Sequence, residues 1–392
     1  MAGVAAVLVV VLSSGDDGSG SPPDPRAKLP LIERRVEQIR ALDFKEPVPA
    51  RLVTPAQVKA EGVAELNRMV PSQLIDTNEV LQFLGLLPEG TNLRRLLASA
   101  LEQQVAGLYD PRIHRLELVR RKGSQNATLD ELTLAHELDH ALDDQNFRLK
   151  DVNAVTDDAA TAYSALVEGT ATAVMQDYAR QHVSGTDALG AALASAGAGS
   201  SEGLPRYVVD SLAFPYIAGL KFVTRLRELG QGWKLVNFAF SARQPTTSEQ
   251  VIHPLAYLRG AGAVPVGLPP AGALGRGWQR DVAGSFGEFD TYELLRTGLS
   301  DARARRASEG WGGGRYALFR RGQYDPACKP PCRATEALAV RWRWDSQRDA
   351  REFAAALRVY AEHRRGAAVS TSPKETTLAI APTSALARTL TR

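Results

Sequence analysis

The chain has 392 residues, 44% of them hydrophobic and 23% charged, which is enough apolar sequence for a sizeable core and excludes a fibrous or wholly disordered protein. With 47 basic and 44 acidic residues the net charge is +3, so nothing in the charge predicts a nucleic-acid partner. Only two cysteines are present, Cys328 and Cys332, which excludes a disulfide-rich scaffold but allows one local disulfide.

The first 29 residues are interpreted as a truncated signal or anchor segment followed by a flexible tether. Residues 1–12 are almost entirely apolar, but they are too few to span a bilayer, which needs about 20 residues. Residues 13–25 are rich in Gly, Ser, Asp and Pro. This order predicts an exported protein, either secreted or held at the outer face of the cytoplasmic membrane by that anchor alone. A disordered start is the alternative.

The next part of the chain, residues 30–104, is predicted to be a helical N-terminal region. Hydrophobic periodicity predicts helices at 30–43, 54–66, 72–86 and 92–105. Residues 105–265 then carry a different pattern. Strand-like runs at 105–109 and 113–119 surround Asp110-Pro111 and predict a hairpin or edge strand. The elements expected after them are helices at 128–146, 156–182 and 205–229, a surface loop at 185–203 and an irregular Pro-rich stretch at 243–275.

Residues 276–365 are predicted to form a small C-terminal α/β module. Its expected features are a Trp-Gly-Gly-Gly turn at 311–314, a strand at 339–344 and a helix at 346–364. The tail, residues 366–392, is rich in Ser, Thr and Ala and is expected to be disordered. The predicted fold class is therefore α+β and predominantly helical.

The segment His136-Glu-Leu-Asp-His140 has the pattern HExxH. Residues i and i+4 share one face of a helix, so His136 and His140 can direct two imidazoles at one metal ion. Glu137 is rotated by about 100° and would lie beside a metal-bound water as a general base. Zinc suits two imidazoles and an oxygen ligand. The alternative is two histidines satisfied by surface contacts on an amphipathic helix.

The third ligand is expected from a second helix. The continuation HExxHxxGxxH is excluded, because Asp143 and Asn146 occupy the required Gly and His positions. Glu168 fits instead, since it follows Leu166 and Val167 and precedes small residues in a helical pattern. Gly169 and Ala171 are expected to let this helix pack closely on the HExxH helix.

Two aspartates after the motif are candidates for supporting the ligands. Asp143 and Asp144 lie three and four residues beyond His140, and either could accept a proton from an imidazole N–H or hold a neighbouring loop. The alternative is a pair of solvated acids at the end of a helix.

Peptide hydrolysis also needs a donor for the developing oxyanion. The candidates are His253 and Tyr257 in the polar segment 247–257, with Tyr109 and Tyr163 as weaker choices. The alternative is that this segment has a structural role and caps the site by hydrogen bonding.

Together, His136-Glu-Leu-Asp-His140 and Glu168-Gly-Thr-Ala resemble the gluzincin zinc metallopeptidases, the thermolysin-like class. More narrowly, the chain is similar to a group of largely uncharacterised, exported or membrane-anchored bacterial metallopeptidases. The pieces that carry this similarity, in order, are Tyr109-Asp-Pro, residues 136–145, Glu168-Gly-Thr-Ala, Phe214-Pro-Tyr216, residues 244–254, Gly310-Trp-Gly-Gly313 and residues 344–353. One departure is Gly314, where an acidic residue is expected.

The resemblance implies a zincin-like catalytic region, here residues 105–265, with a small edge sheet, a helix carrying HExxH and a second helix carrying the glutamate ligand. It implies one Zn²⁺ ion held by His136, His140 and Glu168, with Glu137 as the base. The favoured function is a zinc-dependent peptidase acting outside the cytoplasm on peptides or proteins. The alternative is a catalytically silent envelope protein with the same fold, although the retained Glu137 favours the enzyme. A purely structural zinc is disfavoured, because two His and one Glu leave a position open.

Overall fold

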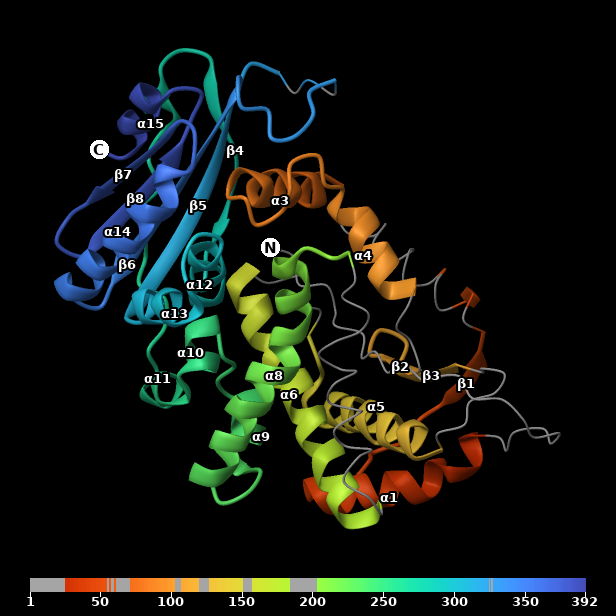
Figure 1. Cartoon of the computed structure of the whole chain (residues 1–392). Helices are drawn as coiled ribbons and strands as arrows, with labels where there is room; N and C mark the ends of the chain where they lie inside the picture. The colour runs from red at the N-terminus through yellow and green to blue at the C-terminus, as the bar shows by residue number, and fades with distance from the viewer. Residues whose placement is uncertain are drawn as a thin grey trace.

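A computed structural model describes residues 25–54, 56, 57, 60, 71–102, 107–119, 127–150, 157–183, 203–323, 325 and 327–392. The expected α+β class is confirmed, because helices surround one small sheet and pack beside a larger one (Figure 1). The predicted anchor (residues 1–12), most of the tether and of the helix at 54–66, and the loop at 185–203 except its last residue lie outside the described residues. None of the described helices is long and apolar enough to cross a membrane.

The helices and strands have the following bounds. The helices are α1 (Leu29–Arg40), α3 (Pro71–Phe83), α4 (Leu93–Glu102), α5 (Ala127–Phe147), α6 (Asp157–His182), α8 (Arg206–Leu229), α9 (Lys234–Ser241), α10 (Ser248–Ile252), α11 (Pro254–Arg259), α12 (Glu288–Arg296), α13 (Asp301–Ser308), α14 (Gln347–Glu362) and α15 (Ser384–Leu390). The strands are β1 (Ala50–Val53), β2 (Gly107–Asp110), β3 (Arg115–Val119), β4 (Trp278–Ser285), β5 (Trp311–Arg321), β6 (Glu336–Trp344), β7 (Ala367–Thr371) and β8 (Glu375–Ile380).

The smaller sheet has the order β1-β3-β2 and lies against α5 (Figure 1). β2 and β3 form the predicted hairpin, with Tyr109 opposite Leu116, and β1 pairs with β3 in parallel. β2 is therefore an edge strand next to the helix that carries HExxH. The sequence did not predict β1, because a strand of four residues is too short to show a period.

Helix α6 makes its closest helix contact with α8, not with α5. A Cβ atom at Gly169 would overlap the backbone of Gly219, and a Cβ atom at Gly219 would overlap the carbonyl of Ala165. The two glycines thus let the backbones of α6 and α8 approach directly. The expectation that Gly169 would let α6 pack closely on the HExxH helix was wrong, because Gly169 faces Gly219 of α8.

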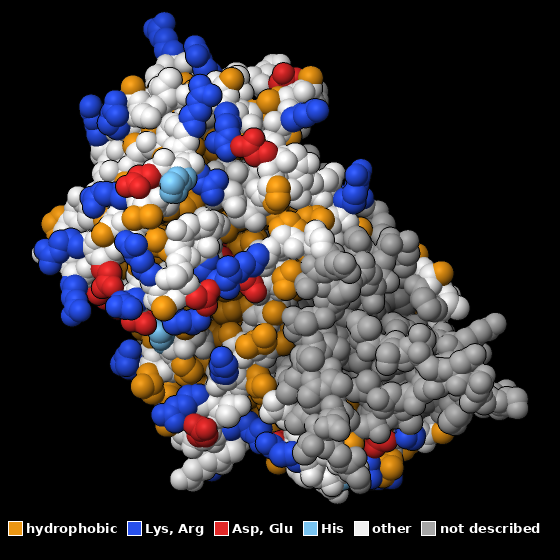
Figure 2. Space-filling model, in the orientation of Figure 1, with side chains coloured by type: hydrophobic (Ala, Val, Ile, Leu, Met, Phe, Trp, Pro, Cys, Tyr) orange, Lys and Arg blue, Asp and Glu red, His pale blue; other side chains and the backbone are white. Residues whose placement is uncertain are grey.

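The larger sheet is antiparallel, with the order β4-β5-β6-β8-β7. Helix α14 contacts strands β6 to β8, while α15 packs on β7 and β8 beside a 3-10 turn at Ala271–Leu274. The sheet is apolar on both faces, since successive residues of β5 such as Ala317 and Leu318 are both fully buried in separate clusters. Figure 2 shows basic and acidic side chains interspersed over the visible outer surface.

The tail beyond residue 366 is ordered, so the prediction of a disordered tail was wrong. It forms β7, β8 and α15, and Leu378, Ile380 and Leu390 are almost completely buried. β8 ends in the consecutive apolar residues Leu378, Ala379 and Ile380, a run too short to separate a buried strand from a helix by its period.

Residues 311–314 begin strand β5 and do not form the predicted turn. A Cβ atom at Gly313 would lie 2.5 Å from the carbonyl oxygen of Val264, and one at Gly314 would overlap the carbonyl oxygen of Phe286. These glycines therefore permit close backbone approach to neighbouring segments. In the connection between β5 and β6, Cys328 and Cys332 form a disulfide.

The N-terminal helices contact two different parts of the protein. Helix α1 packs on α5 and α6 through Ile32, Val36 and other buried residues. Helix α3 lies by the larger sheet, where Glu79 pairs with Arg320 of β5 at 2.9 Å (Figure 1). Helices α1 and α3, which were predicted as parts of one helical region at 30–104, therefore contact different parts of the protein. Helix α1 packs on the HExxH helix, and α3 contacts the C-terminal module.

Candidate metal centre

Three side chains from two helices converge inside the protein. His136 and His140 lie one turn apart on α5, and Glu168 projects from α6. The Nε2 atoms of the two histidines are 3.1 Å apart, and Oε2 of Glu168 lies 3.2 Å from Nε2 of His136 and 3.5 Å from Nε2 of His140. Among the described residues, His136, His140 and Glu168 form the one group of His, Cys, Asp or Glu side chains whose spacing could hold a metal ion.

The spacing of these atoms fits a zinc ion. Zinc–ligand bonds of 2.0–2.1 Å in a tetrahedron place neighbouring ligand atoms about 3.3 Å apart, close to the three separations found here. Two imidazole nitrogens and one carboxylate oxygen also match the ligand preference of zinc and leave a fourth position open. Without a cation, burial disfavours a charged imidazole and lowers the pKa of His136 to about 4, so its Nε2 is available as a neutral ligand.

Glu137 lies beside this group and is buried. Its Oε2 accepts a hydrogen bond of 2.8 Å from the backbone N–H of Tyr109 on β2, which fixes the carboxylate against the edge strand. Burial raises the pKa of Glu137 to about 7, the range in which a general base works best near neutral pH. A cation at the neighbouring ligands would lower this pKa again and favour the ionised base.

The two aspartates after the motif each hold another part of the protein onto α5. Asp143 pairs with the guanidinium of Arg40 on α1. Asp144 accepts hydrogen bonds of 2.8 Å from the hydroxyl of Tyr109 and 2.9 Å from the backbone N–H of Leu149, and its Oδ2 lies 2.8 Å from Nδ1 of His114. Asp144 therefore holds the β2–β3 hairpin, one of the two roles considered for it.

The ligand imidazoles are not oriented by hydrogen bonds on their far side. The Nδ1 atoms of His136 and His140 are buried and have no hydrogen-bond partner in the described part of the chain. In many zinc sites a carboxylate or carbonyl accepts this N–H and sets the ring orientation. Here the rings depend on how α5 itself is placed.

The candidates in segment 247–257 make their hydrogen bonds elsewhere. Nε2 of His253 lies 3.0 Å from Glu288 of α12, and the hydroxyl of Tyr257 donates to the carbonyl of Arg243 at 2.6 Å. Among the described residues, neither side chain has a hydrogen bond to the metal-ligand group. The backbone N–H of Ser248, in the same segment, donates to Asp158 at the start of α6, some ten residues before Glu168. These contacts give the segment a structural role, but they join α6 to the C-terminal module and do not cap the metal-ligand group as the alternative expected.

The weaker tyrosine candidates are also engaged in other contacts. The hydroxyl of Tyr109 donates to Asp144, and the hydroxyl of Tyr163 accepts a hydrogen bond of 3.0 Å from the backbone N–H of Lys150.

The sequence did not predict a role for Tyr216 of α8 at this site. Its ring stacks on that of His136, with the centroids 6.2 Å apart and the planes inclined by 30°. The hydroxyl is buried and has no hydrogen-bond partner in the parts of the chain that the structure describes. Burial and the carboxylates of Glu168 and Glu137 raise the pKa of Tyr216 well above its usual value, so it remains a proton donor. The sequence signal that pointed to Tyr216 was the segment Phe214-Pro-Tyr216, which belongs to the family resemblance but did not indicate a role for the tyrosine.

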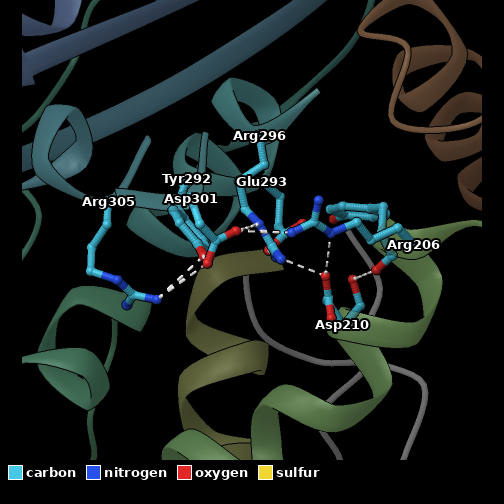
Figure 3. Close-up of polar contacts among 9 residues, drawn as sticks. Arg206, Asp210, Tyr292, Glu293, Arg296, Asp301 and Arg305 are labelled. Carbon is cyan, nitrogen blue, oxygen red and sulfur yellow. Dashed lines mark hydrogen bonds and ion pairs between the residues drawn. The ribbon is translucent and has the colours of Figure 1, made fainter. Parts of the chain in front are cut away.

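Helix α8 is held to the C-terminal module by a network of ion pairs near its first turn (Figure 3). Arg296 of α12 lies 2.8 Å from Asp210 of α8 and 2.7 Å from Asp301 of α13, and Asp301 also pairs with Arg206 of α8 at 3.0 Å. These contacts connect the helix that carries Tyr216 to α12 and α13.

Comparison with known proteins gives two matches. A family model described as a domain of unknown function, DUF8575, matches residues 277–391, which correspond to the module from β4 to α15. A solved structure of a Chloroflexus aurantiacus protein, described as a "putative hydrolase with a novel fold", is similar at 15% sequence identity and a TM-score of 0.41. That match covers 63% of this chain and 92% of the other. No curated protein matches the chain.

Proposed function

We propose that this protein is a zinc-dependent peptidase in which Glu137 is the general base. The observation that carries the proposal is the convergence of His136, His140 and Glu168 at zinc-like spacings, with a buried glutamate directly beside them. A retained base together with an open ligand position favours catalysis over a purely structural metal.

The chemistry is divided among a few groups. Bound by the three ligands, zinc would polarise the scissile carbonyl and lower the pKa of water to about 7. Glu137 accepts the proton of the attacking water and then donates it to the leaving amine. The hydroxyl of Tyr216 donates a hydrogen bond to the carbonyl oxygen as negative charge develops there. The hydroxyl has no hydrogen bond of good geometry in the described structure and interacts with the carboxylate of Glu168, so it lies beside the metal-ligand group, which supports this role.

The edge strand β2 supports a peptide as the substrate. It lies next to α5, and the backbone N–H of Tyr109 already contacts Glu137. An extended peptide can add to an exposed sheet edge through main-chain hydrogen bonds, which would align it with the base.

The proposed setting is outside the cytoplasm. Disulfides persist mainly in oxidising compartments, and the disulfide between Cys328 and Cys332 agrees with the apolar segment at residues 1–12. An anchor there would be the protein's only membrane contact.

The decisive experiment compares the wild type with Glu137→Gln. Both should contain about one zinc ion per chain, because Gln keeps the shape of the side chain and Glu137 is not a ligand. Cleavage of a broad peptide library should fall about 100- to 10,000-fold in Glu137→Gln, since a general base contributes that much.

A wild type that carries zinc but cleaves neither peptides nor denatured proteins would favour the silent envelope protein. Equal cleavage by the wild type and Glu137→Gln would exclude Glu137 as the base.

A further inference from the structure

Three ionisable side chains are buried together beside the metal-ligand group. Arg40, at the end of α1, is completely buried, and its guanidinium pairs with Asp139 at 2.9 Å and with Asp143, both on α5. We call these three residues the Arg40 cluster. Removing such charges from water costs several kcal/mol for each ion unless they are paired with good geometry. A buried cluster of this kind at the HExxH helix therefore needs an explanation beyond packing.

The guanidinium of Arg40 is held on its other sides as well. It lies over the ring of Trp233 at 4.2 Å, and it donates a hydrogen bond of 3.2 Å to Asn237 of α9. The indole N–H of Trp233 donates to the carbonyl of Ile39 at 2.6 Å. Arg40 therefore joins α5 to α1 and α9 through contacts that permit little movement.

The aspartates of the Arg40 cluster lie on one flank of the helix face that carries the ligands. At about 100° per residue, Asp143 and Asp139 are rotated by roughly 60° and 100° from His140 in the same direction. Arg40 contacts both, so it holds this flank of α5 at two points, one turn apart.

Tyr109 holds the opposite flank. Glu137 and Asp144 are rotated by roughly 60° and 40° from His140 in the other direction. The backbone N–H of Tyr109 donates to Glu137 and its hydroxyl donates to Asp144, each at 2.8 Å. Helix α5 is thus held from both sides of its ligand face, by Arg40 and by Tyr109.

This two-sided contact matters because no hydrogen bond to Nδ1 orients His136 or His140 among the described residues. A turn of α5 by about 10° would move an imidazole nitrogen roughly 7 Å from the helix axis by about 1 Å. Metal–ligand distances tolerate only about 0.2 Å. The rotation of α5 therefore decides whether the two imidazoles can meet Glu168 at one ion.

We infer that Arg40 is a positioning residue for the metal centre, which sets the rotation of α5 and so aligns His136 and His140 with Glu168. This inference rests on the proposed zinc site, but it concerns ligand geometry and not the chemical step.

The test measures zinc affinity, by competition with a chelator, and the visible absorption spectrum of the Co²⁺-loaded protein, which reports ligand geometry. Arg40→Lys keeps the charge but replaces the planar fork with one ammonium group. The combined variant Arg40→Met, Asp139→Asn and Asp143→Asn removes the cluster without leaving an unpaired buried charge. We expect zinc affinity to fall about 10- to 100-fold in the combined variant and by less in Arg40→Lys, with altered Co²⁺ spectra in both.

The matched control is Arg35→Met. Arg35 also joins α1 to α5 and α6, through Glu131 at 2.9 Å and Tyr178 at 2.8 Å, but Glu131 precedes His136 by more than one turn. Its loss should lower the melting temperature and leave zinc affinity within about twofold.

Two outcomes would overturn the inference, and they distinguish its failure from failure of the proposed function. If the Arg40 variants bind zinc as tightly as the wild type and keep its Co²⁺ spectrum while their melting temperature falls, the Arg40 cluster is only structural. If the wild type binds no zinc, the proposed function itself fails, and the positioning role fails with it.

Discussion

The hydroxyl of Tyr216 is buried near His136 but has no hydrogen-bond partner among the described residues, which is an unfavourable state for a polar group. A group with a purely structural role would normally be paired. The absence of a partner in the described structure agrees with a donor that is used only when a substrate oxygen becomes negative.

Tyr216→Phe should therefore separate catalysis from folding. We expect kcat to fall about 100- to 1,000-fold, as for the loss of one oxyanion donor. The melting temperature should stay the same or rise, because the change removes an unpaired buried hydroxyl. Peptide-cleavage kinetics and thermal unfolding on the same preparation check both statements.

Tyr178→Phe is the matched control for this change. The hydroxyl of Tyr178 accepts a hydrogen bond from Arg35 at 2.8 Å and donates one to Glu131 at 2.6 Å. Its removal should reduce the free energy of unfolding by about 1–3 kcal/mol and leave kcat nearly unchanged. A Tyr216→Phe enzyme with full kcat would remove Tyr216 from the mechanism.

Among the helices, the contact between α6 and α8 connects the candidate ligand Glu168 to Tyr216. The backbones meet at Gly169 and Gly219, next to the ligand in one helix and three residues from the tyrosine in the other. The separation of these helices therefore sets how far Tyr216 lies from the metal ligands.

Gly169→Ala should force the two helices apart. The added methyl group has no room against the backbone of Gly219, and overpacking of this kind destabilises proteins by about 1–3 kcal/mol. We also expect lower kcat, because Glu168 and Tyr216 move relative to each other. Thermal unfolding and peptide-cleavage assays measure the two effects.

Gly262→Ala provides the comparison, since a Cβ atom there meets nothing within 4 Å. It should change stability by less than about 0.5 kcal/mol. If both alanine variants behave alike, the close approach of α6 and α8 does not limit the site.

In the whole molecule, α10 joins α6 and α8 to α12 of the C-terminal module, and its acidic residue Glu249 makes this junction sensitive to pH. Burial, and then the charges of Glu288 and Asp345, raise the pKa of Glu249 to about 7. The hydrogen bond with Glu288 raises the pKa of His253 at the same junction. Both shifts favour the protonated form in the folded state.

Glu249 should therefore weaken the fold as the pH rises. Its unfolded pKa is about 4.5, below the folded value of about 7. The stabilisation from its bound proton is fully present below about pH 4.5 and is lost progressively as the pH rises to about 7. Glu249→Gln cannot ionise, so its melting temperature should exceed that of the wild type by an amount that grows between pH 5 and pH 8.

Glu362→Gln, an exposed glutamate at the end of α14, is the control and should show no such growing difference. A melting-temperature difference for Glu249→Gln that is constant over this range would contradict the assignment.

The sequence was most informative where function depends on residues within one or two turns of a helix. His136, Glu137 and His140 are placed by the geometry of a single helix, which their spacing already specifies. The proximity of Glu168 to the two histidines could also be predicted, because a glutamate among small and apolar residues in a helix is unusual. The α+β class followed from periods of 3.6 and 2 along the chain.

The sequence was least informative where function depends on which surfaces meet. His253 and Tyr257 were attractive because their segment is polar, but they bind Glu288 and Arg243. A polar segment at a junction between two parts of a protein resembles a polar segment at an active site. The tail from residue 366 was misjudged for a similar reason, because composition does not show that a sheet needs two more strands.

The sequence by itself determined that this protein has a helix with the pattern HExxH, a second helix with a candidate glutamate ligand and a predominantly helical α+β fold. These features follow from local geometry, in which side chains a few residues apart share a face. Only the tertiary structure decided that Tyr216 lies over His136 and that Arg40 pairs with Asp139 and Asp143. Those contacts join residues about 80 to 100 positions apart, and they depend on how helices pack against one another, which no local pattern specifies.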